Sequence, residues 1–461
     1  MKKNAIVGIC LFLFSVFSSA ENPILKGFAD PHTKVWNGKM YMAVGKDKDS
    51  TIKKFSMPYW NIYSSTDLRN WKLENKIDPK DNFMGKGNLN CWATDITTRN
   101  GKCYFYFSNG GNEIGVLVAD KPEGTYIDIL KKPMIPENFS VNHEYDPTIF
   151  KDDDGQYYII FGRNGFDGKN LIHYQMAKLS NDMLSLAETP HDLMTDNLYG
   201  FGGPSRARDH QYFHKYKDTY YLSCGGDYRT SQNIYGPYTN PRKIAQIDGH
   251  SSFCEYNGQW YHIYEYTCEP YGIRQFRQIS MTYLHYKDNG DMVDDENFIQ
   301  GFVGSEPGGF LASTKHIPKG IYYATGVANY DSQWKKIEAE WFFKRVGSLE
   351  KKECPSGGFE IQNIQNNDYL NFPEISNLAP KSTIHFQISS ANPKGGIIEI
   401  HQGSPKGRLL GKCNIKSTDN WSTYQTFSSK LINNTTFANL YFVFRGGNGE
   451  LMRLDWFNFS K

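Results

Sequence analysis

A short β-hairpin signature recurs five times, and this repeat limits the possible folds more than any other feature of the 461-residue sequence. Each copy has a polar turn followed by aromatic and β-branched residues, as expected for antiparallel strands joined by a tight turn. The copies are NGKMYMAVG from Asn37, NGKCYFYFS from Asn100, DGQYYIIFG from Asp154, KDTYYLSCG from Lys217 and NGQWYHIYE from Asn257. Repeats of roughly 40 to 65 residues, none able to bury its own sheet, predict a β-propeller with five blades.

The same repeat predicts a set of residues that meet at the propeller axis. Counting back eleven residues from the aligned aromatic residue of each copy reaches Asp30, Ala93, Asp146, Asp209 and His250. The innermost strand of each propeller blade lines the axial funnel, so equivalent positions converge there. Three carboxylates and a histidine make a poor hydrophobic core, which favours a polar functional site over simple packing between blades.

A second domain is predicted to begin after a looser segment that ends near residue 334. Short alternating runs, among them GGIIEIHQ and ANLYFVFRGG, are separated by Gly, Asn and Ser turns, which is typical of a β-sandwich of about 125 residues. We therefore expect an all-β protein, with a five-bladed propeller over residues 21–325 and a β-sandwich (jelly-roll) domain over residues 335–461.

Residues 1–20 have the basic start, the apolar stretch and the small-residue end of a secretory signal peptide. We expect this segment to be cleaved and the protein to be secreted or periplasmic. No membrane span is expected in the rest of the chain, because no later segment has about 18 consecutive apolar residues. The formal net charge is only +2, which argues against nucleic acid as a partner. A monomer is expected.

Carboxylates that converge in a funnel suit glycoside hydrolysis. One acid must protonate the leaving oxygen while a second carboxylate activates water on the opposite face of the sugar. The sequence has 15% aromatic residues, which suit stacking on sugar faces as well as β-sheet cores. The alternative from another class is a propeller that binds glycans without cleaving them.

The motifs ADPHTKVWNGKMYM, IYSSTDLRNW, CWATDI, EYDPTIFKDDDGQYYIIFG, KLSNDM, NIYGPY and GHSSF resemble glycoside hydrolase family 43 over most of residues 25 to 295. That resemblance implies an inverting enzyme acting on arabinose-, xylose- or galactose-containing glycans without a catalytic cofactor. It implies that Asp30 is the general base and that Asp146 orients the general acid and raises its pKa. It also places a calcium near His250 and makes Trp92 a sugar-facing ring, with core packing as the alternative for both residues.

The fourth repeat departs from the family at the general acid. The family has a Glu there, usually followed by a small residue and Pro, whereas this chain has Asp209-His210-Gln211. Because Asp is one methylene shorter, and a misplacement near 1 Å can cost on the order of 100-fold in rate, three hypotheses remain. Asp209 acts on a shifted sugar, His210 donates the proton in its place, or the propeller only binds. His214, in the same strand, is a further candidate.

The C-terminal domain resembles a family 6 carbohydrate-binding module, with IEAE at its start, GRLLG, the region of Trp421, and LDWFNF at its end. The resemblance implies a structural Ca²⁺ held by Glu338, Glu340 and Asp455, whose hard oxygen ligands suit that ion. It makes Trp421 the sugar platform. Arg453 stands where the family commonly has Asn, so a purely structural sandwich, or one that binds a protein partner with calcium, are the alternatives.

Overall fold

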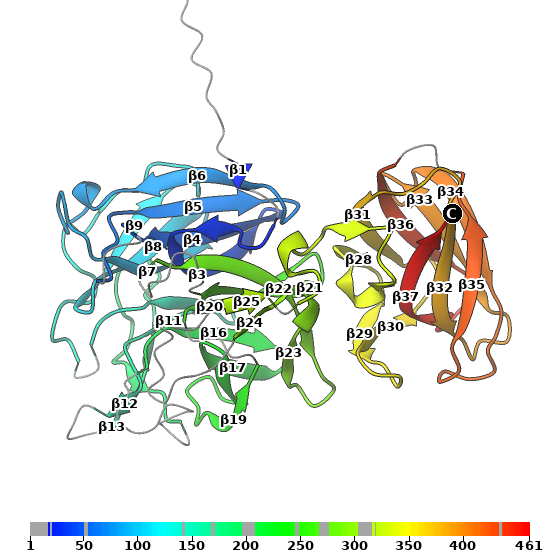
Figure 1. Cartoon of the computed structure of the whole chain (residues 1–461). Helices are drawn as coiled ribbons and strands as arrows, with labels where there is room; N and C mark the ends of the chain where they lie inside the picture. Colours follow the sequence, from blue (N-terminus) through cyan, green and yellow to red (C-terminus); the bar gives the residue numbers. More distant parts are fainter. Residues whose placement is uncertain are drawn as a thin grey trace, which may run out of the picture.

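The computed structural model describes most of the chain (Figure 1). The described residues are 17–18, 21–49, 54–140, 143–166, 171–195, 208–244, 249–266, 276–302, 316–318, 320–432 and 436–461. The predicted signal peptide lies outside them except for Phe17–Ser18, which form the short strand β1. Among the described residues, no helix has the length and hydropathy needed to cross a membrane.

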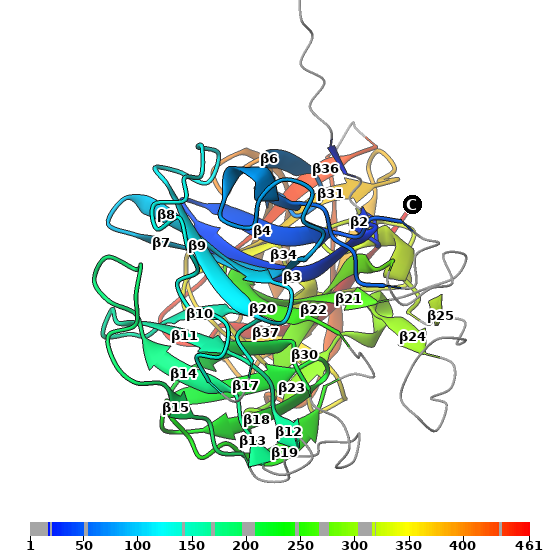
Figure 2. The same cartoon turned by 90° about the vertical axis from the view of Figure 1, so that its left-hand side faces the viewer.

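Five antiparallel sheets stand around a common axis in the described N-terminal part of the chain (Figure 2). The first three, from the axis outwards, are β3 (Phe28–Trp36), β4 (Lys39–Lys46), β5 (Trp60–Ser65) and β6 (Trp71–Ile77); β7 (Cys91–Arg99), β8 (Lys102–Asn109) and β9 (Glu113–Ala119); and β10 (Thr148–Lys151), β11 (Tyr157–Phe161), β14 (Gln175–Lys178) and β15 (His191–Asp192). The other two are β16 (Gln211–Tyr216), β17 (Thr219–Cys224), β18 (Asp227–Ser231) and β19 (Thr239–Lys243); and β20 (Ser251–Tyr256), β21 (Gln259–Tyr266), β22 (Gln278–Tyr286) and β2 (Leu25–Lys26). The first strands of neighbouring sheets contact one another, which confirms the predicted propeller.

Strand β2 closes the ring, because this N-terminal segment pairs with β22 of the last blade. Smaller elements decorate the propeller. They are β12 (Gly165–Phe166), β13 (Leu171–Ile172), β23 (Met292–Asp294), β24 (Gln300–Phe302), β25 (His316–Pro318), and the 3-10 helices η1 (Pro79–Asp81), η3 (Glu296–Phe298) and η4 (Tyr323–Thr325). The closure ties both ends of the propeller segment into one sheet.

The five hairpins do not share one register. Both the first and the fourth hairpin have a two-residue connection, but Tyr41 faces Lys34 across the first, whereas Tyr220 faces Lys215 across the fourth, so Tyr220 stands one residue closer to its turn than Tyr41 does. An equal count of eleven residues thus reaches different rungs of the ladders. The sequence count placed the polar residues in the right region without aligning them residue for residue.

A left-handed backbone marks the structurally equivalent kink before the inner strand. Its φ is 56° at Asp30, 53° at Asp146 and 56° at His210. Asp209 therefore lies one residue before the kink that Asp30 and Asp146 occupy. A left-handed conformation is uncommon for residues other than Gly, and it concentrates at functional sites.

The C-terminal domain is the predicted β-sandwich of two six-stranded sheets (Figure 1). One sheet contains β26 (Tyr330–Asp331), β28 (Lys344–Val346), β31 (Tyr369–Ser376), β33 (Gly396–Gln402), β34 (Arg408–Ile415) and β36 (Ala438–Arg445). The other contains β27 (Ile337–Glu338), β29 (Glu350–Glu353), β30 (Phe359–Ile364), β32 (Thr383–Ser389), β35 (Gln425–Lys430) and β37 (Met452–Ser460). The 3-10 helix η5 (Ala339–Trp341) follows β27.

The two domains share one hydrophobic core. Tyr283 of β22 stacks on Trp341 of η5, with ring centroids 6.4 Å apart and an angle of 5° between the rings. Gln259 of β21 donates to the backbone oxygens of Glu340 and Phe342 at 2.6 and 3.1 Å. The sandwich is therefore packed against the fifth blade rather than joined by a bare linker.

Candidate active site

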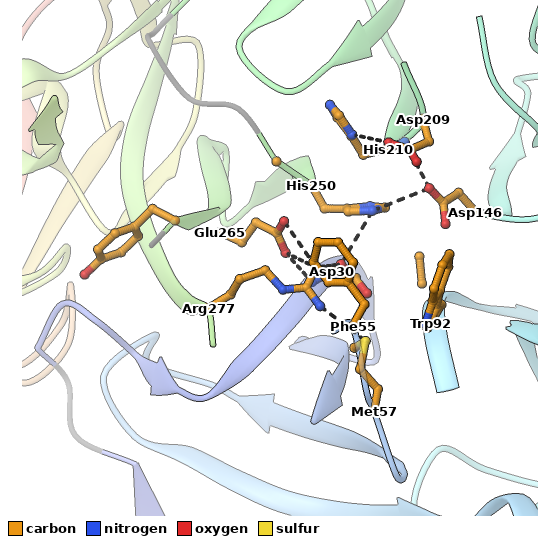
Figure 3. A pocket seen from close by; sticks show the side chains of 13 residues that line it. Asp30, Phe55, Met57, Trp92, Asp146, Asp209, His210, His250, Glu265 and Arg277 are labelled. Carbon is orange, nitrogen blue, oxygen red and sulfur yellow. Dashed lines mark hydrogen bonds and ion pairs between the residues drawn. The ribbon is translucent and has the colours of Figure 1, made fainter. Parts of the chain in front are cut away.

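The predicted polar residues meet in a cavity of about 160 Å³ at the propeller axis (Figure 3). Its lining residues are Asp30, Phe55, Met57, Trp92, Ala93, Asp146, Asp209, His210, Gly249, His250, Glu265, Tyr266 and Arg277. A cavity of about 150 Å³ can hold one benzene ring, so this volume suits one sugar ring rather than a chain. All five positions from the repeat line the cavity, together with Trp92 and His210.

Asp30 is held at the deep end of the cavity. Its backbone N–H donates to Glu265 Oε2 at 2.7 Å, and its Oδ1 accepts a hydrogen bond from Arg277 Nη1, also at 2.7 Å. Only 4% of the Asp30 side chain is exposed. Burial raises the pKa of Asp30, the Arg277 charge lowers it, and the like charge of Glu265 raises it again, so that it stays well above its ordinary value.

Arg277 organises a buried charged cluster that sequence reasoning missed. Its guanidinium also contacts Asp47 at 2.9 Å and Glu265 at 3.4 Å. A signal for Glu265 existed, because it ends the fifth repeat, where the other copies have Gly or Ser. Arg277 and Asp47 lie outside the repeated motifs, so only the folded chain reveals their partnership with Asp30.

Asp146 and His250 lie between the deep and the outer carboxylates (Figure 3). His250 Nε2 is 3.5 Å from both Asp30 Oδ1 and Asp146 Oδ2, so those two oxygens are no more than twice that distance apart. Asp146 Oδ2 also accepts the backbone N–H of His210 at 3.0 Å. Burial lowers the pKa of His250 to about 3, which makes its imidazole neutral.

Asp209 is the most accessible of the three aspartates. Its side chain is 44% exposed, against 4% for Asp30 and 6% for Asp146. Its Oδ1 lies 2.8 Å from His210 Nδ1, and its Oδ2 accepts a hydrogen bond from the Tyr145 hydroxyl at 3.2 Å. The shorter side chain is thus held from both sides.

The pKa shifts of Asp146 and Asp209 differ from the expectation that Asp146 raises the pKa of the general acid. Burial and the like charge of Asp209 raise the pKa of Asp146 to about 8. Burial would also raise the pKa of Asp209, but the hydrogen bond to His210 and the charge of that ring outweigh it and hold the pKa below its usual range. Burial would lower the pKa of His210, but contacts with Cys224 and Asp209 hold it well above its usual value. Asp146 therefore does not leave Asp209 with a raised pKa.

Two other histidine nitrogens bear on the choice of acid. His210 belongs to the cavity lining, but its Nε2 is shielded from solvent and its Nδ1 lies against Asp209 Oδ1. His214 is buried, and its Nε2 lies 2.7 Å from the Tyr286 hydroxyl, in an aromatic cluster between the fourth and fifth blades. His214 does not contribute to the cavity lining.

Trp92 forms part of the cavity wall. It lies edge-on to Phe55, with ring centroids 6.2 Å apart, and edge-on to Tyr145 at 6.5 Å. An aromatic wall, one deep carboxylate and one accessible carboxylate on different blades are the components of a glycosidase site. The fold and the cavity thus define a β-propeller of the sugar-cleaving class.

Comparison with known proteins agrees with this class. The model of "Glycosyl hydrolases family 43" matches residues 20–292, and that of "Carbohydrate binding module (family 6)" matches residues 338–461. The chain therefore belongs to glycosyl hydrolases family 43, and the protein is a glycosidase that hydrolyses O-glycosyl bonds. Both resemblances predicted from the sequence are confirmed.

Several relatives have been named or solved. An arabinoxylan arabinofuranohydrolase of Paenibacillus polymyxa is 27% identical over 95% of this chain and 74% of its own length. A xylosidase/arabinosidase of Bacteroides ovatus is 30% identical over 58% of this chain and 94% of its own length. A solved β-xylosidase/α-arabinofuranosidase of this family, from a compost metagenome and in complex with xylotriose, has a TM-score of 0.51 and 27% identity, covering 60% of this chain and 97% of that one.

The predicted sugar platform of the sandwich is covered on one side. The Arg453 guanidinium lies 4.9 Å from the centre of the Trp421 ring, and its Nε donates to Glu450 Oε1 at 3.1 Å. Trp421 itself is half-buried. The residue that replaces the usual Asn therefore occupies a ring face on which a sugar would stack.

Glu338, Glu340 and Asp455 lie in one charged region but do not form a ligand set. Within the described residues, no three His, Cys, Asp or Glu side chains are arranged to hold a metal ion, and this includes the surroundings of His250. Lys336 Nζ contacts Glu338 Oε1 at 2.5 Å. Burial raises the pKa of Glu338 to about 7 and that of Asp455 to about 6, and Glu340 Oε2 is buried without a hydrogen-bonding partner. Carboxylate oxygens are the donors that calcium prefers, but these three are not arranged as a ligand set, so calcium stays a prediction.

Proposed function

We propose that the protein is an inverting glycosidase that removes single arabinose or xylose units from polysaccharides or oligosaccharides that contain these sugars. The observation that carries this proposal is the cavity of about 160 Å³, which has Asp30 at its deep end and Asp209 at its accessible end. The names of the relatives support the choice of sugars. The size of the cavity supports release of one sugar at a time.

In the proposed mechanism, Asp30 accepts a proton from the water that attacks the anomeric carbon. The bond between that carbon and the leaving oxygen breaks as the new carbon–oxygen bond forms on the opposite face. Arg277 stabilises the ionised form of Asp30, and the neutral His250 lies where it can orient the water or a sugar hydroxyl. Asp146 accepts the backbone N–H of His210 and so holds the segment that carries Asp209 and His210.

The acid in this mechanism is Asp209, with His210 as its proton reservoir. The pair carries one dissociable proton, which resides on the imidazole in the resting site because of the two opposite pKa shifts. As negative charge develops on the leaving oxygen, the proton passes through Asp209 to that oxygen, and the pair is recharged from solvent. His210 is a positioning residue here, because its Nδ1 faces Asp209 and its Nε2 is shielded.

The test is hydrolysis of aryl arabinofuranoside, xyloside and galactoside probes and of arabinoxylan, followed by NMR of the first anomer released. Asp30→Ala should abolish turnover of every substrate. Asp209→Ala should lose activity on the polymer but keep much of it on a dinitrophenyl glycoside, whose leaving group needs no proton. Asp218→Ala, an exposed aspartate in the turn of the same blade, is the matched control. A wild-type protein that binds the polymer but cleaves no probe would be the glycan-binding alternative.

We further propose that the protein is exported and that the sandwich contributes calcium-stabilised contact with the polysaccharide. The composition of residues 1–20 supports export, and the family 6 match supports a carbohydrate-binding role. Cell fractionation together with N-terminal sequencing of the mature protein tests the first point. An uncleaved N-terminus in the cytoplasmic fraction would contradict it.

A further inference from the structure

Another cavity lies at the opposite end of the inner strands from the catalytic cavity. Its volume is about 390 Å³, and its lining residues are Trp36, Thr98, Arg99, Asn100, Gly101, Lys151, Gly155 and Tyr157. Asp30 stands near the start of β3 and Trp36 at its end, and the strand between them spans roughly 20 Å. This cavity, the Trp36 cavity, shares no described lining residue with the catalytic cavity and is therefore a separate place on the propeller.

The Trp36 cavity is built from the ends of the inner strands of the first three blades. The last residues of β3, β7 and β10 are Trp36, Arg99 and Lys151. Both cations lie over the ring of Tyr157, with the Arg99 guanidinium carbon 5.1 Å and Lys151 Nζ 5.7 Å from its centre. The Tyr157 hydroxyl donates to the backbone oxygen of Thr98 at 2.6 Å, which fixes this ring. Three blades thus bring two cations and two aromatic rings together.

Arg99 is held in place by neutral groups. Its Nη2 donates to Asn181 Oδ1 at 2.9 Å, and its Nη1 lies 3.4 Å from the backbone oxygen of Ser180 and 3.6 Å from Met183 Sδ. Within the described residues, its Nε has no hydrogen-bonding partner, and no carboxylate forms an ion pair with Arg99 or Lys151. A guanidinium that is oriented but not neutralised is a preorganised site for a carboxylate, whose geometry matches its planar fork.

The carboxylates of the adjacent turn are engaged elsewhere. Asp152 and Asp153, which follow β10, contact Lys215 Nζ of the fourth blade at 3.2 and 2.8 Å. Asp154 Oδ1 accepts the backbone N–H of Gln156 at 2.8 Å. The described lining of the Trp36 cavity contains no Asp or Glu. The cavity therefore offers positive charge that the chain itself leaves for an anionic ligand.

We propose that the Trp36 cavity is a second glycan-binding site of the propeller, which binds a sugar residue that bears a carboxylate, such as a uronate side group of a polysaccharide. The carboxylate contacts Arg99 and Lys151, and an apolar face of the sugar stacks on the half-buried indole of Trp36. Asn100, in an exposed turn, offers its amide to sugar hydroxyls. The site goes beyond the proposed cleavage reaction, because it holds an acidic polysaccharide on the face of the propeller opposite to Asp30.

The experiment measures retention of the full-length protein in affinity electrophoresis through glucuronoxylan, and through the same polymer after its carboxylates have been reduced to alcohols. The parent protein and all variants carry Asp30→Ala, so that the polymer is not cut during the run. Arg99→Gln should raise the dissociation constant for glucuronoxylan roughly three- to tenfold and leave that for the reduced polymer unchanged. Trp36→Ala should weaken retention by both polymers, because stacking does not need the carboxylate.

Lys217→Gln is the matched control for the loss of a positive charge. Lys217 Nζ also lies over a tyrosine ring, 5.3 Å from the centre of Tyr216, but in the inner hairpin turn of the fourth blade and outside the cavity. This variant should behave as the parent does. Lys151→Gln should reproduce the selective loss in case Arg99→Gln loosens the contact between the second and third blades.

The outcomes decide between a glycan site and its alternatives. If Arg99→Gln and Lys151→Gln are both retained by glucuronoxylan as strongly as the parent, the site does not exist. A loss of the same size on the intact and the reduced polymer overturns the role of the carboxylate. If poly-glutamate retains the parent as strongly as glucuronoxylan does and Trp36→Ala loses nothing, the cavity binds acidic peptides instead. Retention needs no turnover, so these results do not depend on the proposed hydrolysis.

Discussion

Replacing Arg277 by Met should move the catalytic base out of its working pH range. Arg277 Nη1 lies 2.7 Å from Asp30 Oδ1, and both side chains are less than 10% exposed, so solvent screens this pair weakly. A positive charge at such a distance lowers a carboxyl pKa by about 1 to 3 units, at about 1.4 kcal/mol per unit. Burial and the remaining carboxylates would then act on Asp30 unopposed, and its pKa would rise further.

The expected result is a shift of the ascending limb of the pH profile. A base must be ionised to act, so kcat/KM rises with pH through the pKa of Asp30, and a higher pKa moves this limb to higher pH. At pH values below both limbs, Arg277→Met should be slower than the wild type by a constant factor of roughly 10 to 1000, and above the wild-type limb this deficit should shrink tenfold per pH unit until the limb of the variant is reached. The assay is kcat/KM for an aryl glycoside between pH 4 and 9.

Folding must be checked in the same experiment. Breaking a buried ion cluster costs about 3 to 5 kcal/mol, so thermal unfolding and circular dichroism should accompany the kinetics. Arg277→Lys keeps the charge and should leave the ascending limb close to that of the wild type. A folded Arg277→Met protein whose rate falls by the same factor at every pH would refute the reasoning.

Three further predictions concern other parts of the chain. His210→Gln should move the descending limb of the same pH profile to lower pH by about one unit or more, because the proton of the Asp209 pair then loses its imidazole site; an unmoved limb would contradict the reservoir role. Arg453→Asn should uncover a face of Trp421 and strengthen retention in affinity electrophoresis through arabinoxylan, and unchanged mobility would mean that this face binds no sugar. Calcium should raise the melting temperature of the wild type in a concentration-dependent way and EGTA should lower it, whereas Glu340→Gln should lose this response; no response of the wild type would remove calcium from the sandwich.

The hairpin repeat determined the architecture because each hairpin is encoded by residues that are close together in the sequence. Turn residues and alternating side chains encode each hairpin within about ten residues, and hairpins that cannot bury their own sheets must stack. The same repeat brought Asp30, Asp146 and Asp209 to one place, since each residue lies near the start of an inner strand. Fold and site position could therefore be predicted from the chain alone.

Relations between blades could be decided only by the tertiary structure. Arg277 belongs to no repeat, and its contact with Asp30 joins positions separated by 247 residues. In the fourth blade His210, rather than Asp209, lies at the left-handed kink, because the aligned tyrosine stands one residue closer to its turn there, and the strand pairing of the folded chain shows this. The protonation states of the site residues were also decided by the tertiary structure, because a pKa depends on burial and on charges brought together from several blades. The sequence thus determined that Asp30, Asp146 and Asp209 meet, and the packing of the blades decided which partners surround them and where their protons reside.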